Sequence, residues 1–142
     1  MAGFLSEAQE RLDLALYDFD LEQETARLVA SALLEAKRRG VEVRLAFNVD
    51  HEKPIPEPPP PRSDPKLVDE LDVPTKRILG VPDLMHHKYV VRDGSAVLSG
   101  STNWTSDSWT RQENVIVTVA VSIRSSALPA TPSSPLSRIV YV

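Results

Sequence analysis

The fold is decided by residues 12–47, which read LDLALYDFDLEQETARLVASALLEAKRRGVEVRLAF. At the start of this stretch the apolar residues stand at every second position, which is the period of a strand with one buried face: Leu12, Leu14 and Leu16. Over residues 21–39 the apolar positions follow helical spacing, and over residues 41–47 the strand period returns. This order predicts a β-α-β unit, and therefore an α/β fold in which a sheet lies under helical cover.

The predicted helix over residues 21–39 carries charges that match its macrodipole. The acidic residues Glu22 and Glu24 open it, and the basic run at 37–39 closes it before Gly40. Its apolar positions, which should face the sheet, are Leu21, Leu28, Val29, Ala32, Leu33 and Ala36.

Three further strands are predicted in the second half of the chain, at residues 85–91, 96–99 and 114–121. The last of them is an almost continuous apolar run, which is typical of a strand that is buried on both faces. Residues 66–71 predict one short helical turn. The chain therefore contains enough strands for a single sheet of moderate size.

Two segments interrupt this pattern. Residues 54–65 hold seven of the twelve prolines and should form an extended connection over the surface, although a proline-rich ligand for another domain is the alternative. Residues 122–142 mix serine and proline without periodicity, and we expect them to be disordered. The expected organisation is one domain over residues 1–121 followed by a tail over residues 122–142.

Composition limits the class of protein. With 142 residues, of which 42% are hydrophobic, the chain can build one compact core. Cysteine is absent, which excludes disulfides and thiolate metal sites and leaves the compartment open. A basic segment followed by an apolar one is missing from the start, and no apolar run approaches a membrane span, so we expect a soluble chain. The sequence does not identify its compartment, and the cytoplasm is the favoured expectation. The formal charge of −4 provides no global field for nucleic acid or anionic lipid, so any phosphate site must be local.

Polar residues stand at fixed spacing in the second half. His86 is followed after one residue by Lys88, after four more by Asp93 and after six more by the run GSTN at 100–103. At average residue usage, a chance match to six fixed positions is on the order of one in a million for a chain of this length. The spacing therefore carries more information than the composition does.

Strand geometry predicts where these side chains point. On a strand His86 and Lys88 project to one side, while Asp93 projects to the other. Ser101 and Asn103 are also two residues apart and project together if their segment is extended. An imidazole, an ammonium, a hydroxyl and an amide can then converge on one oxyanion, for which a phosphate is the natural occupant.

This spacing resembles the signature of the phospholipase D superfamily, and the β-α-β unit of residues 12–47 is similar to that family's opening unit. The likeness extends from Phe4 to Val119. It implies an α/β/α sandwich with a mixed sheet, and a reaction that cleaves or exchanges a phosphodiester through a phosphohistidine, without metal or other cofactor. Family members usually finish with a helix that covers the sheet, which residues 122–142 do not resemble. A truncated or frame-shifted reading frame would produce such a tail.

The resemblance implies a role for each residue of the motif. His86 is the nucleophile, and Glu113 is the candidate acceptor that fixes its tautomer, in its own or in a partner chain. Asp93 makes an orienting or structural hydrogen bond. The catalytic set is thus His86, Lys88, Asp93 and Glu113. The phosphate is bound by Lys88, Ser101 and Asn103.

The chain carries one copy of the motif, whereas the family's mechanism needs two histidines, one as nucleophile and one as acid for the leaving oxygen. A homodimer that places two His86 side chains across a two-fold axis would supply both. His87 faces away from His86 and is expected to be packed or at the surface rather than a metal ligand, and His51 is expected to be exposed to solvent.

The substrate is left open by the sequence. The negative net charge disfavours a nonspecific nuclease, so a phospholipid is favoured, with peripheral membrane contact, and an endonuclease-type phosphodiesterase is the alternative. A noncatalytic domain that keeps the motif is a second alternative. Trp104 and Trp109, which flank the segment after Asn103, could stack a base, enter a lipid interface or simply pack in the core.

Overall fold

The computed structural model describes residues 1–21, 23–49, 63–79 and 85–120. It confirms the β-α-β unit, since β1 (Arg11–Leu16), α2 (Gln23–Arg38) and β3 (Glu42–Val49) follow one another with only the two-residue strand β2 (Phe19–Asp20) between the first two. β1 and β3 are parallel, and Leu14 lies beside Leu45. The alternating apolar residues of both strands are buried, as the strand period predicts.

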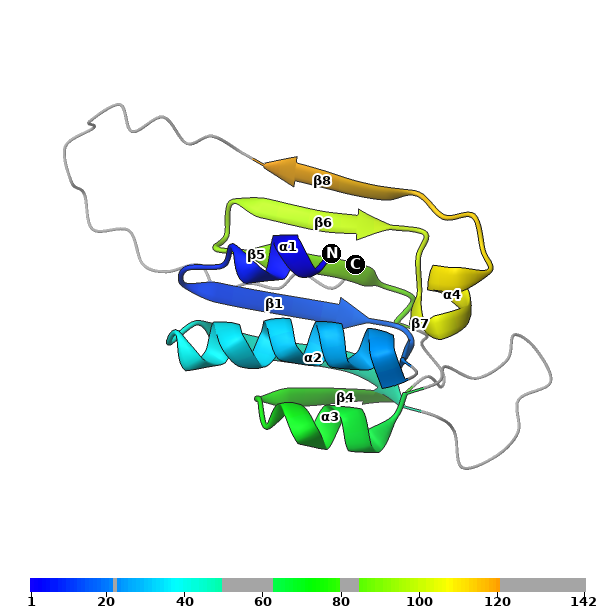
Figure 1. Ribbon diagram of the computed structural model, residues 1–142, viewed down its shortest axis with the longest axis horizontal. Helices are drawn as coiled ribbons and strands as arrows, with labels where there is room; N and C mark the ends of the chain where they lie inside the picture. The colour runs from blue at the N-terminus through cyan, green and yellow to red at the C-terminus, as the bar shows by residue number, and fades with distance from the viewer. Residues whose placement is uncertain (22, 50–62, 80–84, 121–142) are drawn as a thin grey trace.

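Six strands form one mixed sheet in the order β4-β3-β1-β5-β6-β8, which Figure 1 shows from its helical side. The remaining members are β4 (Thr75–Leu79), β5 (Lys88–Arg92), β6 (Ala96–Gly100) and β8 (Ile116–Ala120). β4, β3 and β1 are parallel to one another, whereas β5, β6 and β8 pair antiparallel. A second, two-stranded sheet pairs β2 with β7 (Trp104–Thr105) at the end of the main sheet. The expected mixed α/β class is confirmed.

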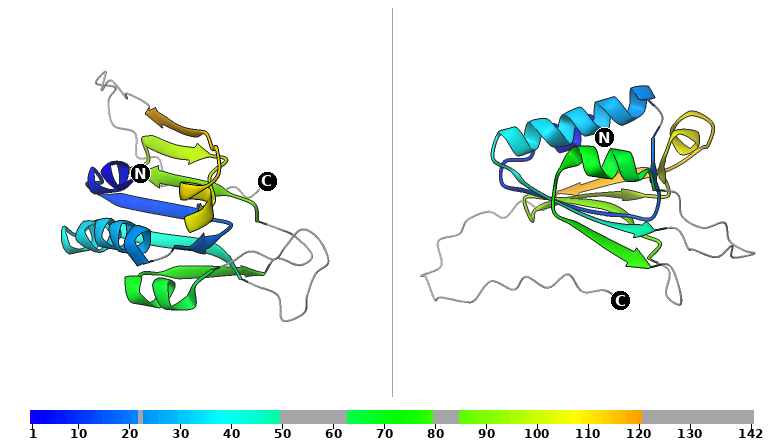
Figure 2. Two further views of the ribbon diagram at one scale, coloured as in Figure 1. Left: turned by 45° about the vertical axis from the view of Figure 1, so that its right-hand side comes forward. Right: turned by 90° about the horizontal axis from the view of Figure 1, so that it is seen from below.

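Helices cover one face of the main sheet (Figure 2). This layer consists of α1 (Ala2–Ser6), α2 and α3 (Pro65–Leu71), and the short helix α4 (Ser106–Thr110) lies beside the end of the sheet. α3 confirms the helical turn expected at residues 66–71, and its N-cap Asp64 accepts a hydrogen bond from the backbone of Lys66. Within the described residues, the opposite face of the sheet has no helical cover.

One position on α2 was assigned wrongly to the buried face. Val29 and Leu33 are buried against the sheet, but Leu28 is 61% exposed. Residue 28 is rotated by roughly 100° from residue 29 on an α-helix, so it lies at the margin of the apolar stripe rather than at its centre. Leu21 is buried, but it precedes the helix.

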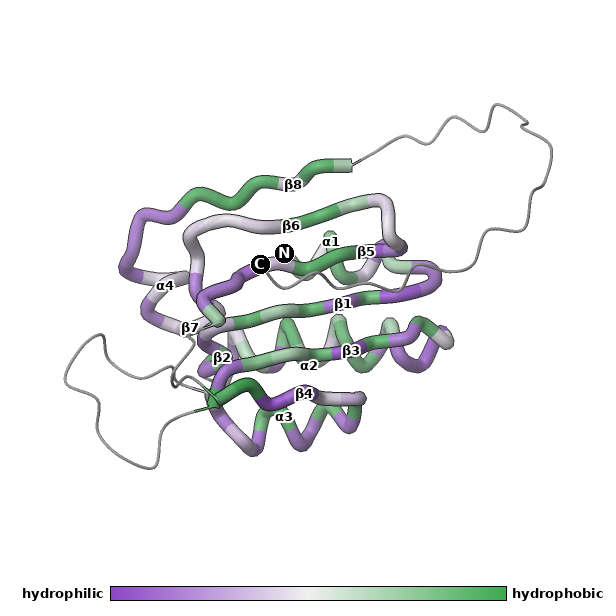
Figure 3. Tube along the Cα trace, turned by 180° about the vertical axis from the view of Figure 1, so that it is seen from behind, coloured by the Kyte–Doolittle hydropathy of each residue, from purple (hydrophilic) through white to green (hydrophobic). Residues whose placement is uncertain are grey.

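The strand expected to be buried at residues 114–121 is instead an edge strand, so this prediction was wrong. Among the strands of the described residues β8 pairs with β6 alone, and Val115, Ile116, Val117 and Val119 are between 47% and 65% exposed. Figure 3 shows the apolar residues of β8 along the outer edge of the sheet. The helical layer lies over the strands from β4 to β6 and does not extend to β8 (Figure 1). An apolar run reports a preference for burial, but the number of neighbouring strands is decided by the rest of the fold.

One predicted strand begins later than expected, and other predicted segments lie outside the described residues. The strand expected at 85–91 begins only at Lys88, as β5. His51, most of the proline-rich segment and the whole tail at 122–142 lie outside the described residues. None of the described helices combines the length and the apolar character that crossing a bilayer requires.

Candidate functional site

The first two motif residues, His86 and Lys88, lie where β1 ends and β5 begins. In the antiparallel pair of these strands, Leu16 at the end of β1 lies opposite Lys88 at the start of β5. The pairing continues one step further, because the backbone N–H of Tyr17 donates to the carbonyl oxygen of His87 at 2.7 Å. This end of the sheet therefore brings residues 17 and 18 of the first strand region against residues 86 to 88 of the motif.

His86 and Lys88 contact each other directly, as their shared side of the strand predicts. Nζ of Lys88 lies 3.1 Å from Nε2 of His86 and donates to the His86 carbonyl oxygen at 3.2 Å. The His86 side chain is accessible to solvent, whereas Lys88 is half-buried. An ammonium group thus stands beside an accessible imidazole nitrogen.

Tyr17 completes this cluster and was not identified from the sequence. Its ring centroid lies 4.5 Å from that of His86, at an edge-on angle of 61°. Nζ of Lys88 lies over the face of the same ring, 5.0 Å from its centroid. The sequence signal is weak, because a tyrosine at the end of a predicted strand is most simply explained by packing.

The environment favours a neutral imidazole at His86. Burial lowers the pKa of His86, and the positive charges of Lys88 and His87 lower it further. Because an ammonium can only donate, Nε2 of the neutral ring is the acceptor in the contact with Lys88, which leaves the proton on Nδ1. Burial also lowers the pKa of Lys88, while the nearby carboxylate of Asp18, itself buried, acts in the opposite sense.

Asn103 is held in the loop that leads to β7. Its backbone carbonyl accepts a hydrogen bond from Nε1 of Trp109 at 3.0 Å, and its side-chain Oδ1 is buried with no hydrogen-bond partner among the described residues. Trp104 is fully buried, and its ring lies 6.0 Å from that of Trp109. The structure therefore uses the two tryptophans to pack this loop, whose amide side chain keeps unused bonding capacity.

Ser101 does not join Lys88 in this structure. Its hydroxyl donates to Oδ1 of Asn114 at 2.8 Å and accepts from the backbone N–H of Val115 at 3.0 Å. The single proton of the hydroxyl is therefore committed to the junction between β6 and β8. Binding of a phosphate by Ser101 stays a prediction, and it would require these bonds to be exchanged.

Glu113 is exposed just before β8. Within the part of the chain that the structure describes, no hydrogen bond or ion pair links it to His86. Its role as the acceptor that orients the imidazole, in its own or in a partner chain, therefore stays a prediction.

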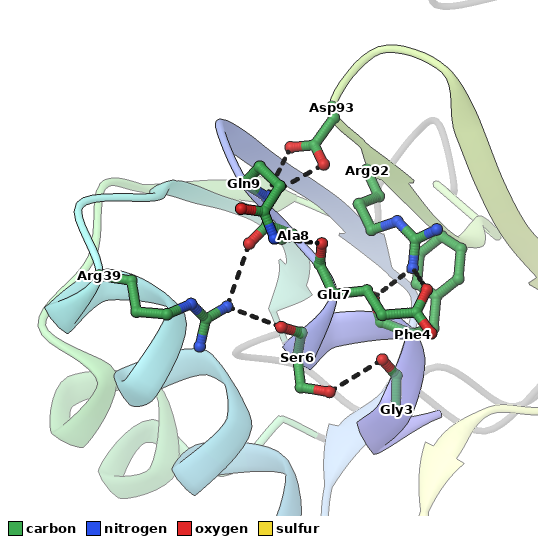
Figure 4. Close-up of polar contacts among 9 residues, drawn as sticks. All are labelled: Gly3, Phe4, Ser6, Glu7, Ala8, Gln9, Arg39, Arg92 and Asp93. Carbon is green, nitrogen blue, oxygen red and sulfur yellow. Dashed lines mark hydrogen bonds and ion pairs between the residues drawn. The ribbon is translucent and has the colours of Figure 1, made fainter.

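Asp93 lies at the opposite end of β5 from the histidine cluster. Its carboxylate accepts the backbone N–H groups of Gln9 at 3.1 Å, Glu10 at 2.8 Å and Arg11 at 2.9 Å (Figure 4 draws the bonds to Gln9). Burial alone would raise the pKa of Asp93, but these three N–H groups and the charge of Arg92 outweigh it, and the pKa is lowered. The third residue of the motif thus makes structural hydrogen bonds.

The backbone at Asp93 forms the tight turn between β5 and β6. Asp93 has φ 51° and Gly94 has φ 63°, and the N–H of Ser95 donates to the carbonyl oxygen of Arg92 at 3.1 Å. Two consecutive positive φ angles define the type I′ turn, for which Asp-Gly is a favoured pair. One residue therefore sets both the hairpin and its contact with the N-terminal segment.

Two arginines hold the same N-terminal segment from other sides (Figure 4). Nη2 of Arg39 donates to the carbonyl oxygens of Ser6 at 2.9 Å and Ala8 at 3.1 Å. Arg92 donates to the carbonyl oxygen of Phe4 at 3.0 Å, lies 4.3 Å over the Phe4 ring and pairs with Glu7. We call Arg39, Arg92 and Asp93 the N-terminal clamp. Sequence reasoning missed the two arginines, because isolated charges at the ends of elements carry no distinctive spacing.

His87 points away from the cluster. Its ring lies 5.6 Å from that of Tyr89, on the side of the strand opposite to His86 and Lys88. Among the described residues, no three histidine, aspartate or glutamate side chains converge as the ligands of a metal ion would. The two adjacent histidines therefore occupy different environments.

Comparison with known proteins gives consistent relatives. Residues 1–127 match the family described as "Cardiolipin synthase, PLD-like domain". Over 113 residues the chain is 34% identical to the mitochondrial cardiolipin hydrolase of Xenopus laevis, covering 78% of this chain and 48% of that protein. Over 122 residues it is 30% identical to that of Xenopus tropicalis, covering 80% and 49%. The chain thus spans about half the length of these curated relatives.

Solved structures share the fold. Nuc from Salmonella typhimurium, a phospholipase D family member, superposes with a TM-score of 0.63 at 19% identity, over 84% of this chain and 72% of that one. NucT from Helicobacter pylori superposes with a TM-score of 0.58 at 24% identity, over 82% of this chain and 72% of that one. At these identities the likeness extends to the fold alone.

Proposed function

This chain belongs to the phospholipase D superfamily, and from that premise we propose that it cleaves or transfers a phospholipid phosphodiester through a phosphohistidine at His86. The observation that carries the proposal is the contact between Nζ of Lys88 and Nε2 of His86 at 3.1 Å. A cation beside a neutral, accessible imidazole is the arrangement that an anionic phosphodiester needs, because the ammonium binds the phosphate oxygens while the imidazole attacks phosphorus.

The chemistry follows from the protonation states. In the first step the ammonium of Lys88 transfers its hydrogen bond from Nε2 of His86 to a phosphate oxygen, the freed lone pair of Nε2 forms a bond to phosphorus, and the bond from phosphorus to the leaving oxygen breaks. The leaving oxygen takes a proton from an acid. In the second step water, or an alcohol in a transfer reaction, gives its proton to the deprotonated acid of the first step and forms a bond to phosphorus, and the bond from phosphorus to Nε2 of His86 breaks. Lys88 offsets the negative charge that develops on the phosphate oxygens, and the amide of Asn103 adds a hydrogen-bond donor.

The acid comes from a second copy of the chain in this proposal. His87 is turned toward Tyr89 and cannot reach the same phosphate, so one chain supplies one histidine from the described part of the motif. A homodimer with two His86 side chains across its two-fold axis supplies the nucleophile and the acid. The exposure of His86 in the single chain supports this arrangement, and Glu113 of the partner would then be free to orient it.

A phospholipid is the substrate class that is best supported. The relatives at 34% and 30% identity are named for the hydrolysis of cardiolipin. The formal charge of −4 is unfavourable for a nonspecific nuclease, which needs a basic surface. A noncatalytic domain that keeps the motif is the second candidate, because the Ser101 hydroxyl is committed to Asn114 and Val115 and Glu113 does not contact His86.

The test is a comparison of substrates on the purified chain. Cardiolipin vesicles, phosphatidylcholine vesicles and single-stranded DNA are each incubated with wild type and with His86→Gln, in the presence and absence of EDTA. We expect release of a phospholipid head group that EDTA does not change and that His86→Gln abolishes. Cleavage of DNA alone would overturn the substrate class, and loss of activity in EDTA with recovery on adding a divalent ion would overturn the metal-independent mechanism. Inactivity toward all three substrates would favour the noncatalytic candidate.

A further inference from the structure

Tyr17 is the side chain through which the two motif residues are held from outside their own strand. It follows β1, and its ring is 6% exposed. One edge contact joins it to His86, with centroids 4.5 Å apart, and its face receives the ammonium of Lys88 at 5.0 Å. Neither contact is implied by the spacing of the motif.

We propose that Tyr17 is a positioning residue, whose ring fixes the relative placement of the His86 imidazole and the Lys88 ammonium. The role rests on the proposed function of this site, because a fixed pair has value only if both groups act on one substrate. Tyr17 itself makes no bond with a reacting atom in this proposal.

The geometry gives the ring the means to do this. The face of an aromatic ring is electron-rich and attracts an ammonium, while edge-on contact is a favoured arrangement for two rings. Lys88 has a long, flexible side chain, so a second attractive surface beside His86 restricts the positions of its ammonium. The ring therefore orders the more mobile member of the pair.

The backbone fixes the ring in turn. The N–H of Tyr17 donates to the carbonyl oxygen of His87 at 2.7 Å, which ties the residue to the motif strand at the point between His86 and Lys88. Burial of the ring limits its own rotation. This backbone bond continues the pairing of β1 with β5 and sets where the side chain starts, whereas the placement of a cation over the ring face depends on the tyrosine itself.

Tyr89 offers a matched control. It lies beside His87 with ring centroids 5.6 Å apart, so it repeats the tyrosine–histidine contact one residue away, on the other side of the strand. The same change, tyrosine to leucine, can therefore be made at both positions. If the effect at Tyr17 is specific, Tyr17→Leu will change the NMR signals of His86, whereas Tyr89→Leu will change those of His87.

The experiment uses the full chain and two measurements. The imidazole signals of His86 are followed by NMR across a pH titration and assigned by their loss in His86→Gln. The variants are Tyr17→Phe, Tyr17→Leu and Tyr89→Leu, which leave the other charged groups around His86 in place, namely Lys88, His87 and Asp18. The second measurement is kcat and KM on the substrate that wild type hydrolyses.

We expect Tyr17→Phe to reproduce the wild-type signals, because it keeps the ring. In Tyr17→Leu the His86 signals should lose their ring-current shift, and the pKa of His86 should rise toward its ordinary value because the part of the imidazole that Tyr17 covers becomes more hydrated. The value of kcat should fall roughly 10- to 100-fold in Tyr17→Leu, and by less than about 3-fold in Tyr17→Phe, since misplacement of reacting groups acts on kcat. Tyr89→Leu should shift the signals of His87.

Two results would overturn the proposal. One is a Tyr17→Leu protein whose His86 signals match wild type, and the other is a Tyr89→Leu protein in which His86 changes as much as in Tyr17→Leu. If Tyr17→Leu does not fold, replacement of Tyr17 by pentafluorophenylalanine keeps the shape and reverses the charge distribution of the ring. Unchanged Lys88 ε-carbon signals in that protein would contradict the ring–ammonium contact. The NMR results hold even if wild type is inactive, so failure of the proposed function is recognised separately.

Discussion

A Cβ atom at Gly100 would lie 2.0 Å from the carbonyl oxygen of Val115, a separation that no side chain tolerates. β6 and β8 therefore approach each other closely only because this position is glycine. The N–H of Ser101 then donates to the same carbonyl at 3.0 Å, and the edge strand begins one residue later. The glycine of the motif thus has a structural reason for its place.

Gly100→Ala should destabilise the protein. The atom in the way belongs to the backbone of Val115, so the strands must separate, and we expect a loss of about 2–4 kcal/mol in the free energy of unfolding. Urea denaturation followed by circular dichroism measures it. Gly3→Ala in α1 is the control, because no atom lies within 4 Å of its added Cβ, and it should be neutral or stabilising by up to about 1 kcal/mol. Equal effects of the two substitutions would contradict the close approach.

Asp93→Asn should weaken the N-terminal clamp by about 1–3 kcal/mol at neutral pH, since an amide replaces a carboxylate that accepts three backbone N–H groups. The control is Asp72→Asn, which has a similar φ of 46° but an exposed side chain paired with Lys37. Asparagine tolerates this backbone conformation, so the control should change stability by less than about 0.5 kcal/mol.

The effect of Asp93 should depend on pH in a definite direction. Its pKa in the folded state lies below the ordinary value of 3.8, so the ionised form is favoured by folding. This contribution to stability is present above the pKa of the unfolded chain and is lost as pH falls through the folded value. Chemical denaturation at a series of pH values should therefore show wild type and Asp93→Asn converging in strong acid. A constant difference down to the lowest pH would mean that the carboxylate charge is not the cause.

His86 should titrate below its ordinary pKa of 6.5, because burial and the charges of Lys88 and His87 disfavour the imidazolium. The fraction of nucleophile in its neutral form, and with it the acidic limb of kcat/KM, should follow the same titration. NMR of the imidazole in wild type and in Lys88→Met gives the measurement. Removal of the ammonium should raise the pKa of His86. A lower pKa of His86 in Lys88→Met would show that the charge of Lys88 does not act in the expected direction.

The dimer is tested by mixing chains. If each active site needs two His86 side chains, turnover per wild-type chain should fall as His86→Ala is added in excess and subunits exchange, since a mixed dimer keeps one histidine. Specific activity should also fall on dilution as dimers dissociate. Exchange is confirmed with chains that carry different fluorophores. Turnover that stays constant after confirmed exchange would show that one chain suffices.

The sequence predicted the β-α-β unit well, because local periodicity and burial agree there. Leu14 and Leu45 each stand at every second position with other large apolar residues, and both are buried in the core. Where burial depends on distant elements, the same reasoning failed. Val117 belongs to a run as apolar as any central strand, yet it is 49% exposed at the edge of the sheet. The place of a strand in the sheet depends on the whole chain, and the local spacing of apolar residues carries no information about it.

The sequence predicted those contacts of the candidate site that lie within one stretch of chain, but not those made by distant segments. Alternation along an extended chain placed His86 beside Lys88, and the contact is present although β5 begins only at Lys88. Alternation along one strand could not reveal Tyr17, because this residue follows β1 and lies about 70 residues earlier in the chain. The same alternation predicted that the side chains of Ser101 and Asn103 project together if their segment is extended. In the structure β6 ends at Gly100, and Ser101 forms hydrogen bonds with the backbone of Val115.

The placement of Asp93 and His86 at opposite ends of β5 has a genetic consequence. Alleles at the two positions could both be recovered in a screen for lost activity, although one removes the proposed nucleophile and the other loosens the N-terminal segment. Temperature would separate them. An Asp93 allele should recover at low growth temperature, where the folded fraction is restored, whereas a His86 allele should remain null at every temperature.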